Sequence, residues 1–223
     1  MDGERDVREM ARRAIEGGDP TGWFEELYRA AARGAAAVPW DRDAPHSRLA
    51  EWAARSRVDG RGRRALVVGA GLGRDAEFVA GLGFDVVAFD VSAAAVASAR
   101  RRHPGSAVRY VVADLFDPPG EWDGAFDLVV ESMTVQSLPE PPRRAAIGRV
   151  GRFVAPGGTL LVIAAGRDPD LPFEGPPWPL TRDEIDAFRV GELRVVSVEE
   201  LRGDDPVFAW RAELHRPDPD TRA

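Results

Sequence analysis

Residues 65–90 constrain the fold of this chain more than any other segment. They read ALVVGAGLGRDAEFVAGLGFDVVAFD, in which two short apolar runs are separated by a glycine-rich turn and a stretch with helical spacing. A strand that is apolar at every position has helices over both of its faces, as in a parallel sheet. The segment therefore predicts a strand–helix–strand unit with a tight turn after its first strand.

The alternation of strands and helices continues along the chain. Strands are predicted at 65–69, 85–90, 108–113, 127–131 and 159–164, and helices at 74–82, 92–102 and 141–153. Two further strands, 192–199 and 206–215, are joined by too few residues for a helical crossover and should form an antiparallel hairpin. We therefore predict an α/β fold with a doubly wound, Rossmann-like, seven-stranded sheet that is mostly parallel and ends in this hairpin.

Residues 1–62 are expected to form an N-terminal helical cap. Helices are predicted at 4–16, at a segment that opens with Asp19 as N-cap and Pro20 in the first turn, and at 47–57. Residues 63–216 would then form the core domain and 217–223 a flexible tail. Within the core domain, the proline-rich stretch 166–180 is expected to be an ordered loop or a mobile lid, and a capping box at 181–184 opens a short helix.

Composition excludes several classes of function. The chain has no cysteine, and all 30 of its basic residues are arginine, which removes disulfides, thiolate zinc sites, Schiff-base lysines and the lysine of a P-loop. A net charge of -7 disfavours nucleic-acid partners, whose binding requires neutralised phosphates. No apolar run approaches the ~20 residues that span a bilayer, and the N-terminus lacks an apolar signal core. We expect a cytoplasmic protein that acts on a small molecule, without a membrane partner.

Polar features follow four of the predicted strands, where ligands bind in open α/β sheets. These features are Gly69–Gly73, Asp90, Asp114 and Glu131. The carboxylate of Asp90 can accept hydrogen bonds from two ribose hydroxyls, and Asp114 can accept one from an adenine amine. Leu115 or Phe116 would supply a backbone N–H and an apolar wall. An adenosine with polar contacts at both ends satisfies these groups, and none of them is needed for a pyrophosphate.

A dinucleotide cofactor remains an alternative at this stage. The Rossmann fingerprint is G-x-G-x-x-G, whereas Gly69, Gly71 and Gly73 form G-x-G-x-G and Arg74 takes the place of the third fingerprint glycine. Asp90 lies at a suitable spacing for a ribose diol, so an NAD(P)-dependent oxidoreductase stays open. A lysine-free chain, however, cannot contain a Tyr-x-x-x-Lys pair. A tight turn that binds no ligand is the simplest alternative.

Four segments together resemble the successive motifs of class I S-adenosylmethionine-dependent methyltransferases. They are GAGLGRDAEFVAGLGFDVVAFDVS, VVADLFD, FDLVVES and VAPGGTLLVIA, and the resemblance covers roughly residues 63–166. GWFEELYRAA…VPWD and ESMTVQSLPEPPR are loosely similar to thiopurine and tellurite methyltransferases. The resemblance implies S-adenosylmethionine as cofactor, bound by Gly69, Gly71, Gly73, Asp75, Asp90, Val91, Asp114, Leu115, Phe116 and Glu131.

This sequence departs from the family pattern at one position. The family commonly has an acid two residues before the first glycine, where it organises the methionine end of the cofactor, and here that residue is Val67. Candidate partners for the cofactor ammonium are then backbone carbonyls near Gly69 and the side chain of Glu131.

The resemblance further implies methyl transfer to an oxygen, nitrogen or sulfur atom of a small molecule. In such an in-line displacement the protein mainly binds and aligns the reactants and excludes water. A non-catalytic domain that binds the cofactor is the other alternative. Trp23, Phe24 and Tyr28 could cover the sulfonium or could simply pack the cap.

Candidate catalytic residues are Trp40, His46, Glu131 and Gln136. His46 could act as a base or cap a helix, and His103 and His215 are expected at the surface. We predict no metal site, because the adenine and substrate roles account for the acids that end the strands.

Overall fold

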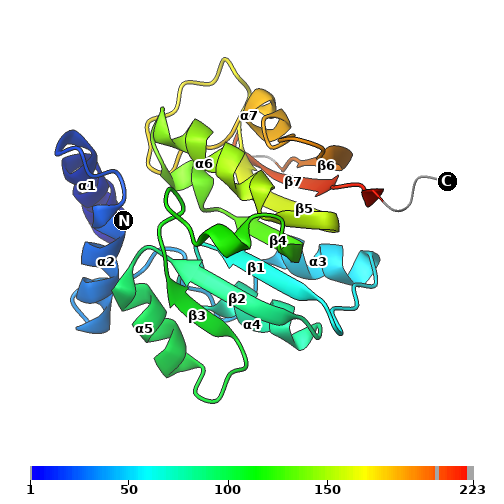
Figure 1. Ribbon diagram of the computed structural model, residues 1–223. Helices are drawn as coiled ribbons and strands as arrows, with labels where there is room; N and C mark the ends of the chain where they lie inside the picture. Colours follow the sequence, from blue (N-terminus) through cyan, green and yellow to red (C-terminus); the bar gives the residue numbers. More distant parts are fainter. Residues whose placement is uncertain (1, 204–205, 220–223) are drawn as a thin grey trace.

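A computed structural model describes residues 2–203 and 206–219 and confirms the predicted α/β fold. The strands are β1 (Arg64–Val68), β2 (Asp85–Asp90), β3 (Arg109–Val112), β4 (Phe126–Ser132), β5 (Val154–Gly166), β6 (Arg194–Leu201) and β7 (Phe208–His215). They form one sheet in the order β3-β2-β1-β4-β5-β7-β6 (Figure 1). The first five strands are parallel, and β7 runs antiparallel to both β5 and β6.

Helices cover both faces of this sheet. They are α1 (Asp2–Glu16), α2 (Gly22–Ala32), α3 (Ser47–Arg55), α4 (Arg74–Gly81), α5 (Ala93–Arg102), α6 (Pro142–Arg152) and α7 (Arg182–Asp186), with 3₁₀ turns at η1 (Gly120–Trp122) and η2 (Val135–Ser137). Buried side chains of α3, α4 and α5 pack against one face of the sheet, and those of α6 and α7 against the other. The sheet is therefore the middle of three layers.

The apolar run of β1 shows why this strand has no polar face. Ala65 and Val67 point into the cluster under α3–α5, whereas Leu66 and Val68 point into the cluster under α6. All four side chains are at most 2% exposed. Two packed faces require an apolar residue at every position, which is the pattern that predicted a parallel sheet.

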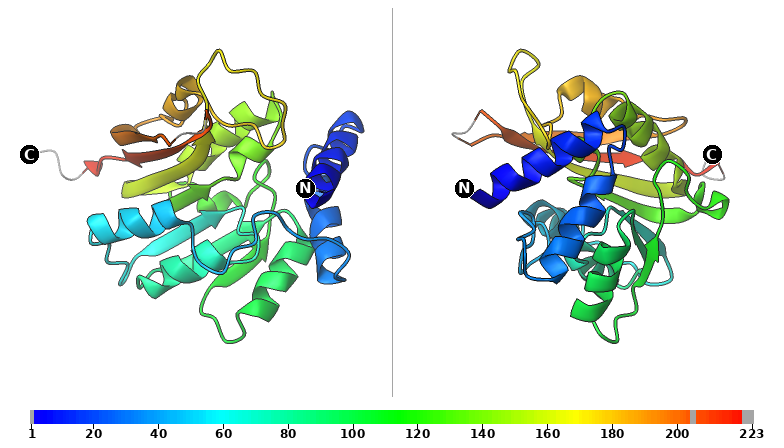
Figure 2. Two further views of the ribbon diagram at one scale, coloured as in Figure 1. Left: turned by 180° about the vertical axis from the view of Figure 1, so that it is seen from behind. Right: turned by 90° about the vertical axis from the view of Figure 1, so that its left-hand side faces the viewer.

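Helices α1 and α2 lie beyond the carboxyl ends of the parallel strands (Figures 1 and 2). A small apolar cluster joins them to the glycine turn and to α5 through Leu72 and Ala95. The carboxylate of Glu25 on α2 accepts hydrogen bonds from the Ser92 hydroxyl (2.6 Å) and the Ala94 N–H (2.9 Å). A negative charge at a helix N-terminus is favourable, so this contact fastens α2 to the start of α5.

The start of α2 differs from the sequence prediction. The residue before the helix is Thr21, not Asp19, and Thr21 makes no side-chain cap. Asp19 instead accepts the backbone N–H of Thr21 (3.2 Å) and of Gly22 (2.8 Å) across a tight turn. The Asp19 carboxylate thus still accepts a hydrogen bond from the first N–H group of α2, although the helix begins two residues later than predicted.

The C-terminal part of the core matches the predicted hairpin, with β6 as the edge strand. The residues Pro156-Gly157-Gly158 lie inside β5, where the pairing with β4 shifts register. Arg216 follows β7 and stays paired, since its N–H donates to Gly158 (2.9 Å) and its carbonyl accepts from Gly157 (2.8 Å). The predicted capping box at Thr181 is confirmed. Of the predicted tail, residues 220–223 lie outside the described residues.

Candidate functional site

One cavity of about 450 Å³ opens at the carboxyl ends of β1, β2, β3 and β4. This volume falls in the range of small-molecule sites, ~300–1,000 Å³. Its floor is the glycine turn, and its other walls come from α1, α2, the segment 39–46, the residues after β4 and two prolines of the loop after β5. The cavity therefore lies where the polar strand ends predicted a ligand.

The three glycines of the turn are required by conformation and by space. Gly69, Gly71 and Gly73 have φ angles of +63°, +51° and +91°, which favour glycine. A Cβ at Gly71 would come within 2.9 Å of the Tyr28 hydroxyl, and one at Gly69 or Gly73 would overlap a neighbouring side chain. The turn is thus locked between its neighbours, and its backbone faces the cavity.

Asp90 ends β2 and holds this turn in place. Its Oδ2 accepts the N–H of Gly71 (2.9 Å) and its Oδ1 accepts the N–H of Ser92 (2.9 Å). Burial raises the pKa of Asp90 to about 6, against the lowering effect of the two backbone hydrogen bonds. Each oxygen retains a second lone pair, and the residue lines the cavity. Asp90 can therefore bind hydroxyl groups while it fixes the turn.

The residues after β2 and β3 form a second part of the floor. Val91 is 37% exposed and lines the cavity, as do Asp114, Leu115 and Phe116. The Oδ1 of Asp114 accepts the N–H of Phe116 (2.8 Å), so that N–H is already used. This arrangement leaves Leu115 as the candidate backbone donor and keeps one oxygen of Asp114 for a ligand.

Asp75 binds the segment that carries His46. The Oδ1 of Asp75, in the first turn of α4, accepts the N–H of His46 (2.7 Å). The Nδ1 of His46 accepts the N–H of Arg48 (3.2 Å) and so caps α3. Burial lowers the pKa of His46, which favours the neutral ring. With Nδ1 accepting, a neutral ring carries its proton on Nε2, and His46 can donate to a ligand but cannot act as a base in this arrangement.

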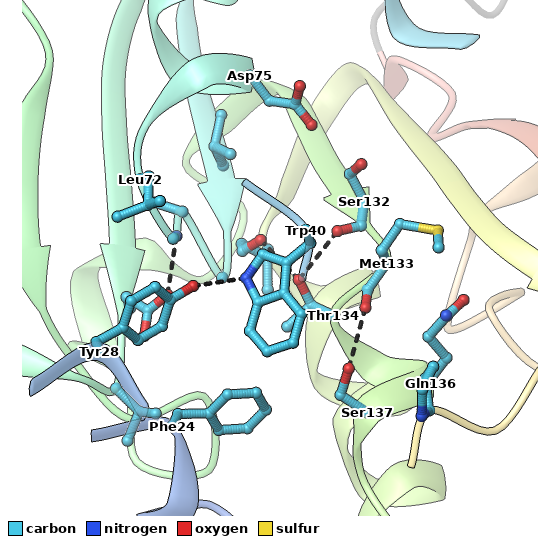
Figure 3. Close-up of a pocket in the computed structure, with 18 of the residues that line it drawn as sticks. Phe24, Tyr28, Trp40, Leu72, Asp75, Ser132, Met133, Thr134, Gln136 and Ser137 are labelled. Carbon is cyan, nitrogen blue, oxygen red and sulfur yellow. Dashed lines mark hydrogen bonds between the residues drawn. The ribbon is translucent and has the colours of Figure 1, made fainter. Parts of the chain in front are cut away.

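Aromatic side chains from the cap form one wall of the cavity (Figure 3). The Nε1 of Trp40 donates to the hydroxyl of Tyr28 (2.8 Å), and the rings of Trp23 and Phe24 stack with centroids 3.9 Å apart. Trp40 meets both of these rings edge-on, at 6.0 and 6.4 Å. Trp40 is 36% exposed, whereas Tyr28 is 3% exposed. The same aromatic side chains therefore pack the N-terminal helices and line the cavity.

Glu131 lies behind the cavity wall. It is fully buried, does not line the cavity, and its Oε1 accepts the N–H of Thr134 (2.8 Å) and of Val135 (2.9 Å). Its Oε2 has no hydrogen-bond partner among the described residues. Burial raises the pKa of Glu131 to about 7. The carboxyl group thus shapes the turn that holds Met133 at a φ of +63° on the cavity surface.

Gln136 connects the residues after β4 to the proline-rich loop. Its Oε1 accepts the N–H of Ala165 (2.6 Å) and its backbone carbonyl accepts the N–H of Trp178 (2.7 Å). The residue lines the cavity but is 1% exposed. The guanidinium of Arg167 donates to three carbonyls of residues 169, 171 and 179, at 3.0 to 3.1 Å. The loop is therefore an ordered wall, which decides between the two expectations for it.

Several lining residues were not anticipated from the sequence. They are Val7, Arg8, Thr21, Arg42, Leu138, Pro176 and Pro177. The two prolines belong to the loop that was expected to be ordered or to act as a lid. No sequence pattern indicated that residues of α1 would line the cavity. His103 and His215 are half-buried, not at the surface as expected, and the Nε2 of His103 lies 3.3 Å from the carbonyl of Leu72.

Neither a cluster of metal ligands nor a helix of membrane-spanning length occurs among the described residues. They contain no group of three or more histidine or acidic side chains that could hold a metal ion. None of their helices is long and apolar enough to cross a membrane.

A family model described as a methyltransferase domain matches residues 65–158. The segment 65–158 is therefore a methyltransferase domain by its sequence. The match covers the glycine turn, both aspartates and the start of β5. It favours a methyltransferase over the NAD(P)-dependent oxidoreductase alternative.

Known proteins resemble the chain in sequence and in fold. A ubiquinone biosynthesis O-methyltransferase of Xanthomonas oryzae pv. oryzae is 33% identical over 139 residues, which are 58% of this chain and 57% of that protein. The chain thus spans little more than half the length of such curated relatives.

Two solved structures show the same fold as this chain. The N-methyltransferase NodS of Bradyrhizobium japonicum, in complex with S-adenosylhomocysteine, has a TM-score of 0.65 at 21% identity and covers 86% of this chain and 99% of its own. The [4+2]-cyclase SpnF has a TM-score of 0.66 at 18% identity, with 87% and 93% covered.

Proposed function

We propose that this chain binds S-adenosylmethionine in the cavity and transfers its methyl group to an oxygen, nitrogen or sulfur atom of a small molecule. One observation carries the proposal: the glycine turn, Asp90 and Asp114 border a single cavity within a methyltransferase domain. In this proposal adenine lies at the end of β3, against Leu115 and Asp114, and the ribose lies against Asp90.

The residues present fit this cofactor. Asp90 keeps free lone pairs for a ribose diol, Val91 and Leu115 offer apolar surface, and the cavity volume of about 450 Å³ is that of a small-molecule site. The cofactor, when bound, supplies an activated methyl group on a sulfonium. The protein then has to align the acceptor with that methyl group and exclude water.

The acceptor side of the cavity is apolar and aromatic. Phe24, Trp40, Met133, Pro176 and Pro177 line it, opposite the residues assigned to the cofactor. Aromatic and proline surfaces bury flat apolar molecules well. We therefore propose an acceptor of small size with an apolar ring.

Three titratable side chains of the segment 39–46 and the start of α4 are already engaged. Asp41 pairs with Arg102 at 2.6 Å, Asp75 binds the N–H of His46, and His46 caps α3. An acceptor that reaches its reactive form without a protein base suits such a wall. Thiols, free amines and acidic ring hydroxyls have this property. The sequence relation to a ubiquinone biosynthesis O-methyltransferase puts ring hydroxyls first among these candidates.

A methyl-transfer assay tests the proposal. The chain is incubated with methyl-labelled S-adenosylmethionine and a panel of ring hydroxyls, thiols and amines, and formation of S-adenosylhomocysteine and of labelled product is measured. We expect turnover with at least one apolar ring acceptor, and loss of turnover in Gly71→Val. Tight cofactor binding without turnover across the panel would favour a non-catalytic or non-methylating protein, a role that the cyclase with this fold illustrates.

A further inference from the structure

The hydroxyl of Tyr28 lies directly over the glycine turn. Tyr28 projects from α2 into the cavity, and its oxygen is the atom that a Cβ on Gly71 would meet first, at 2.9 Å. The side chain is 3% exposed. Figure 3 shows this ring beside the turn, with Trp40 between it and the residues after β4. A polar atom thus reaches the floor of the cavity from an otherwise aromatic wall.

The hydrogen bond from Trp40 leaves this hydroxyl with a proton to donate. Trp40 Nε1 can only donate, so the 2.8 Å contact occupies a lone pair of the Tyr28 oxygen. No atom of the described residues accepts the Tyr28 proton. Burial raises the pKa of Tyr28 above its ordinary value, and the nearby Asp90 adds to this effect, so the hydroxyl keeps its proton. A buried donor without an acceptor is costly, about 1–3 kcal/mol, and is usually satisfied by a ligand or water.

The position of Tyr28 indicates which part of the cofactor is within reach; this step rests on the proposed function. The sheet order β3-β2-β1-β4 places adenine, at the end of β3, and ribose, at Asp90, on one side of the turn. The methionine part must then lie over β1 and β4, beside Gly71. That part offers an ammonium group, which donates, and a carboxylate, which accepts. Only the carboxylate can take the proton of Tyr28.

We propose that Tyr28 binds the carboxylate of the cofactor's methionine moiety through its hydroxyl, with Trp40 as the residue that positions this hydroxyl. The chain has Val67 where its family commonly has an acid, and Glu131, the other candidate for the methionine end, lies behind the cavity wall. The contact from the cap therefore anchors an end of the cofactor that the sheet itself holds weakly. It also makes α2 part of the cofactor site.

A comparison of two ligands tests this assignment. S-adenosylhomocysteine has the amino-acid end, whereas methylthioadenosine keeps the adenosine and the sulfur but lacks that end. Calorimetric titration of Tyr28→Phe should show affinity for S-adenosylhomocysteine reduced about tenfold or more, because the lost hydrogen bond has a charged partner. Affinity for methylthioadenosine should stay within about twofold of the unmodified chain. Trp40→Phe should show the same selectivity with a smaller loss.

Tyr110→Phe is the matched control. Its hydroxyl donates to Glu77 (2.6 Å) and lies against Gly73 from outside the cavity, so its removal disturbs the turn without removing a ligand contact. We expect no selective loss in this variant. Equal losses for both ligands in Tyr28→Phe, or no loss for either, would overturn the assignment. A chain that binds neither ligand before any substitution would instead overturn the proposed function, so the two failures are distinguishable.

Discussion

The two sides of the cavity are built in different ways. The cofactor side comes from consecutive strand ends between residues 67 and 116, and backbone hydrogen bonds to Asp90 fix its geometry. The acceptor side is assembled from α1, α2, the segment 39–46, the residues after β4 and the loop after β5, and Tyr28 of α2 also reaches the glycine turn. Side-chain contacts between distant segments, such as those of Trp40 with Tyr28 and Asp41 with Arg102, hold it together. The geometry of the cofactor side thus follows from the sheet itself. The geometry of the acceptor side depends on how the N-terminal helices and loops pack onto the sheet.

Gly71→Val should show the largest effect, and on the cofactor side. A β-branched residue is strained at a φ of +51°, and its Cβ would meet the Tyr28 hydroxyl at 2.9 Å. We expect affinity for S-adenosylhomocysteine to fall by at least about tenfold by calorimetry, with the circular dichroism spectrum of the native fold retained. Gly62→Val is the matched control, because Gly62 has a φ of +74° and no neighbour within 4 Å. A similar loss of affinity in the control would mean that backbone strain alone accounts for the effect.

Asp90→Ala should lower both affinity and stability. It leaves the N–H groups of Gly71 and Ser92 buried without an acceptor, and each such group costs about 1–3 kcal/mol. Asp114→Ala should weaken cofactor binding less, since Asp114 is exposed and binds only its own loop. Chemical denaturation and ligand titration of both variants measure the difference. Equal losses of affinity and stability in the two variants would contradict the different roles assigned to Asp90 and Asp114.

Glu131→Gln should change how stability depends on pH. The folded pKa of Glu131 is about 7 and the ordinary value is 4.5, so the unfolded chain loses this proton first as pH rises. The group therefore lowers the free energy of unfolding progressively between about pH 4.5 and 7, and the penalty is constant above that. Glutamine can still accept both N–H groups and does not ionise.

We expect Glu131→Gln to gain stability relative to the unmodified chain as pH rises, by about 2–3 kcal/mol at pH 8. Urea denaturation at several pH values measures this gain. A stability difference that does not vary with pH would show that Glu131 ionises normally in the folded chain.

Asp41→Asn should have the smallest effect on stability and a selective effect on the acceptor side. The pair with Arg102 is partly exposed, and such pairs contribute about 1 kcal/mol or less. We expect the KM for the acceptor to rise by a larger factor than the Kd for S-adenosylhomocysteine, because Asp41 holds the segment whose Trp40 ring lines the acceptor side and whose indole N–H donates to Tyr28. Steady-state kinetics of Asp41→Asn, Arg102→Gln and the double variant measure this. A larger effect on cofactor affinity than on the KM for the acceptor would contradict the assignment of segment 39–46 to the acceptor side.

The sequence predicted the sheet, the succession of strands and helices along the chain, and the strand ends that border the cavity. These depend on local patterns: apolar runs for buried strands, glycines for a turn with positive φ, and acids at strand ends. In a parallel sheet such ends must lie side by side. Asp90 and Asp114 could therefore be placed without knowledge of any distant contact.

The acceptor side could not be predicted in the same way. Glu131 ends its strand as expected, but the following turn folds back and uses its Oε1, which turns the carboxyl group away from the cavity. His46 follows a proline in a loop, a position compatible with a base or with a helix cap. The hydrogen bond from the Arg48 N–H to its Nδ1 shows that it caps the helix. The cavity residues of α1 carry no sequence pattern apart from amphipathic spacing. The side chains of Glu131 and His46 bind residues only two to four positions away, but the sequence does not show which of several local contacts forms.

The central claim is that the glycine turn holds S-adenosylmethionine, and competitive calorimetry tests it most directly. The unmodified chain is titrated with S-adenosylmethionine, S-adenosylhomocysteine, NADH and NADPH under the same conditions. We predict micromolar or tighter binding of the two sulfur compounds and no binding of either nicotinamide cofactor. Binding of NADH or NADPH alone, or of none of the four ligands, would contradict the account.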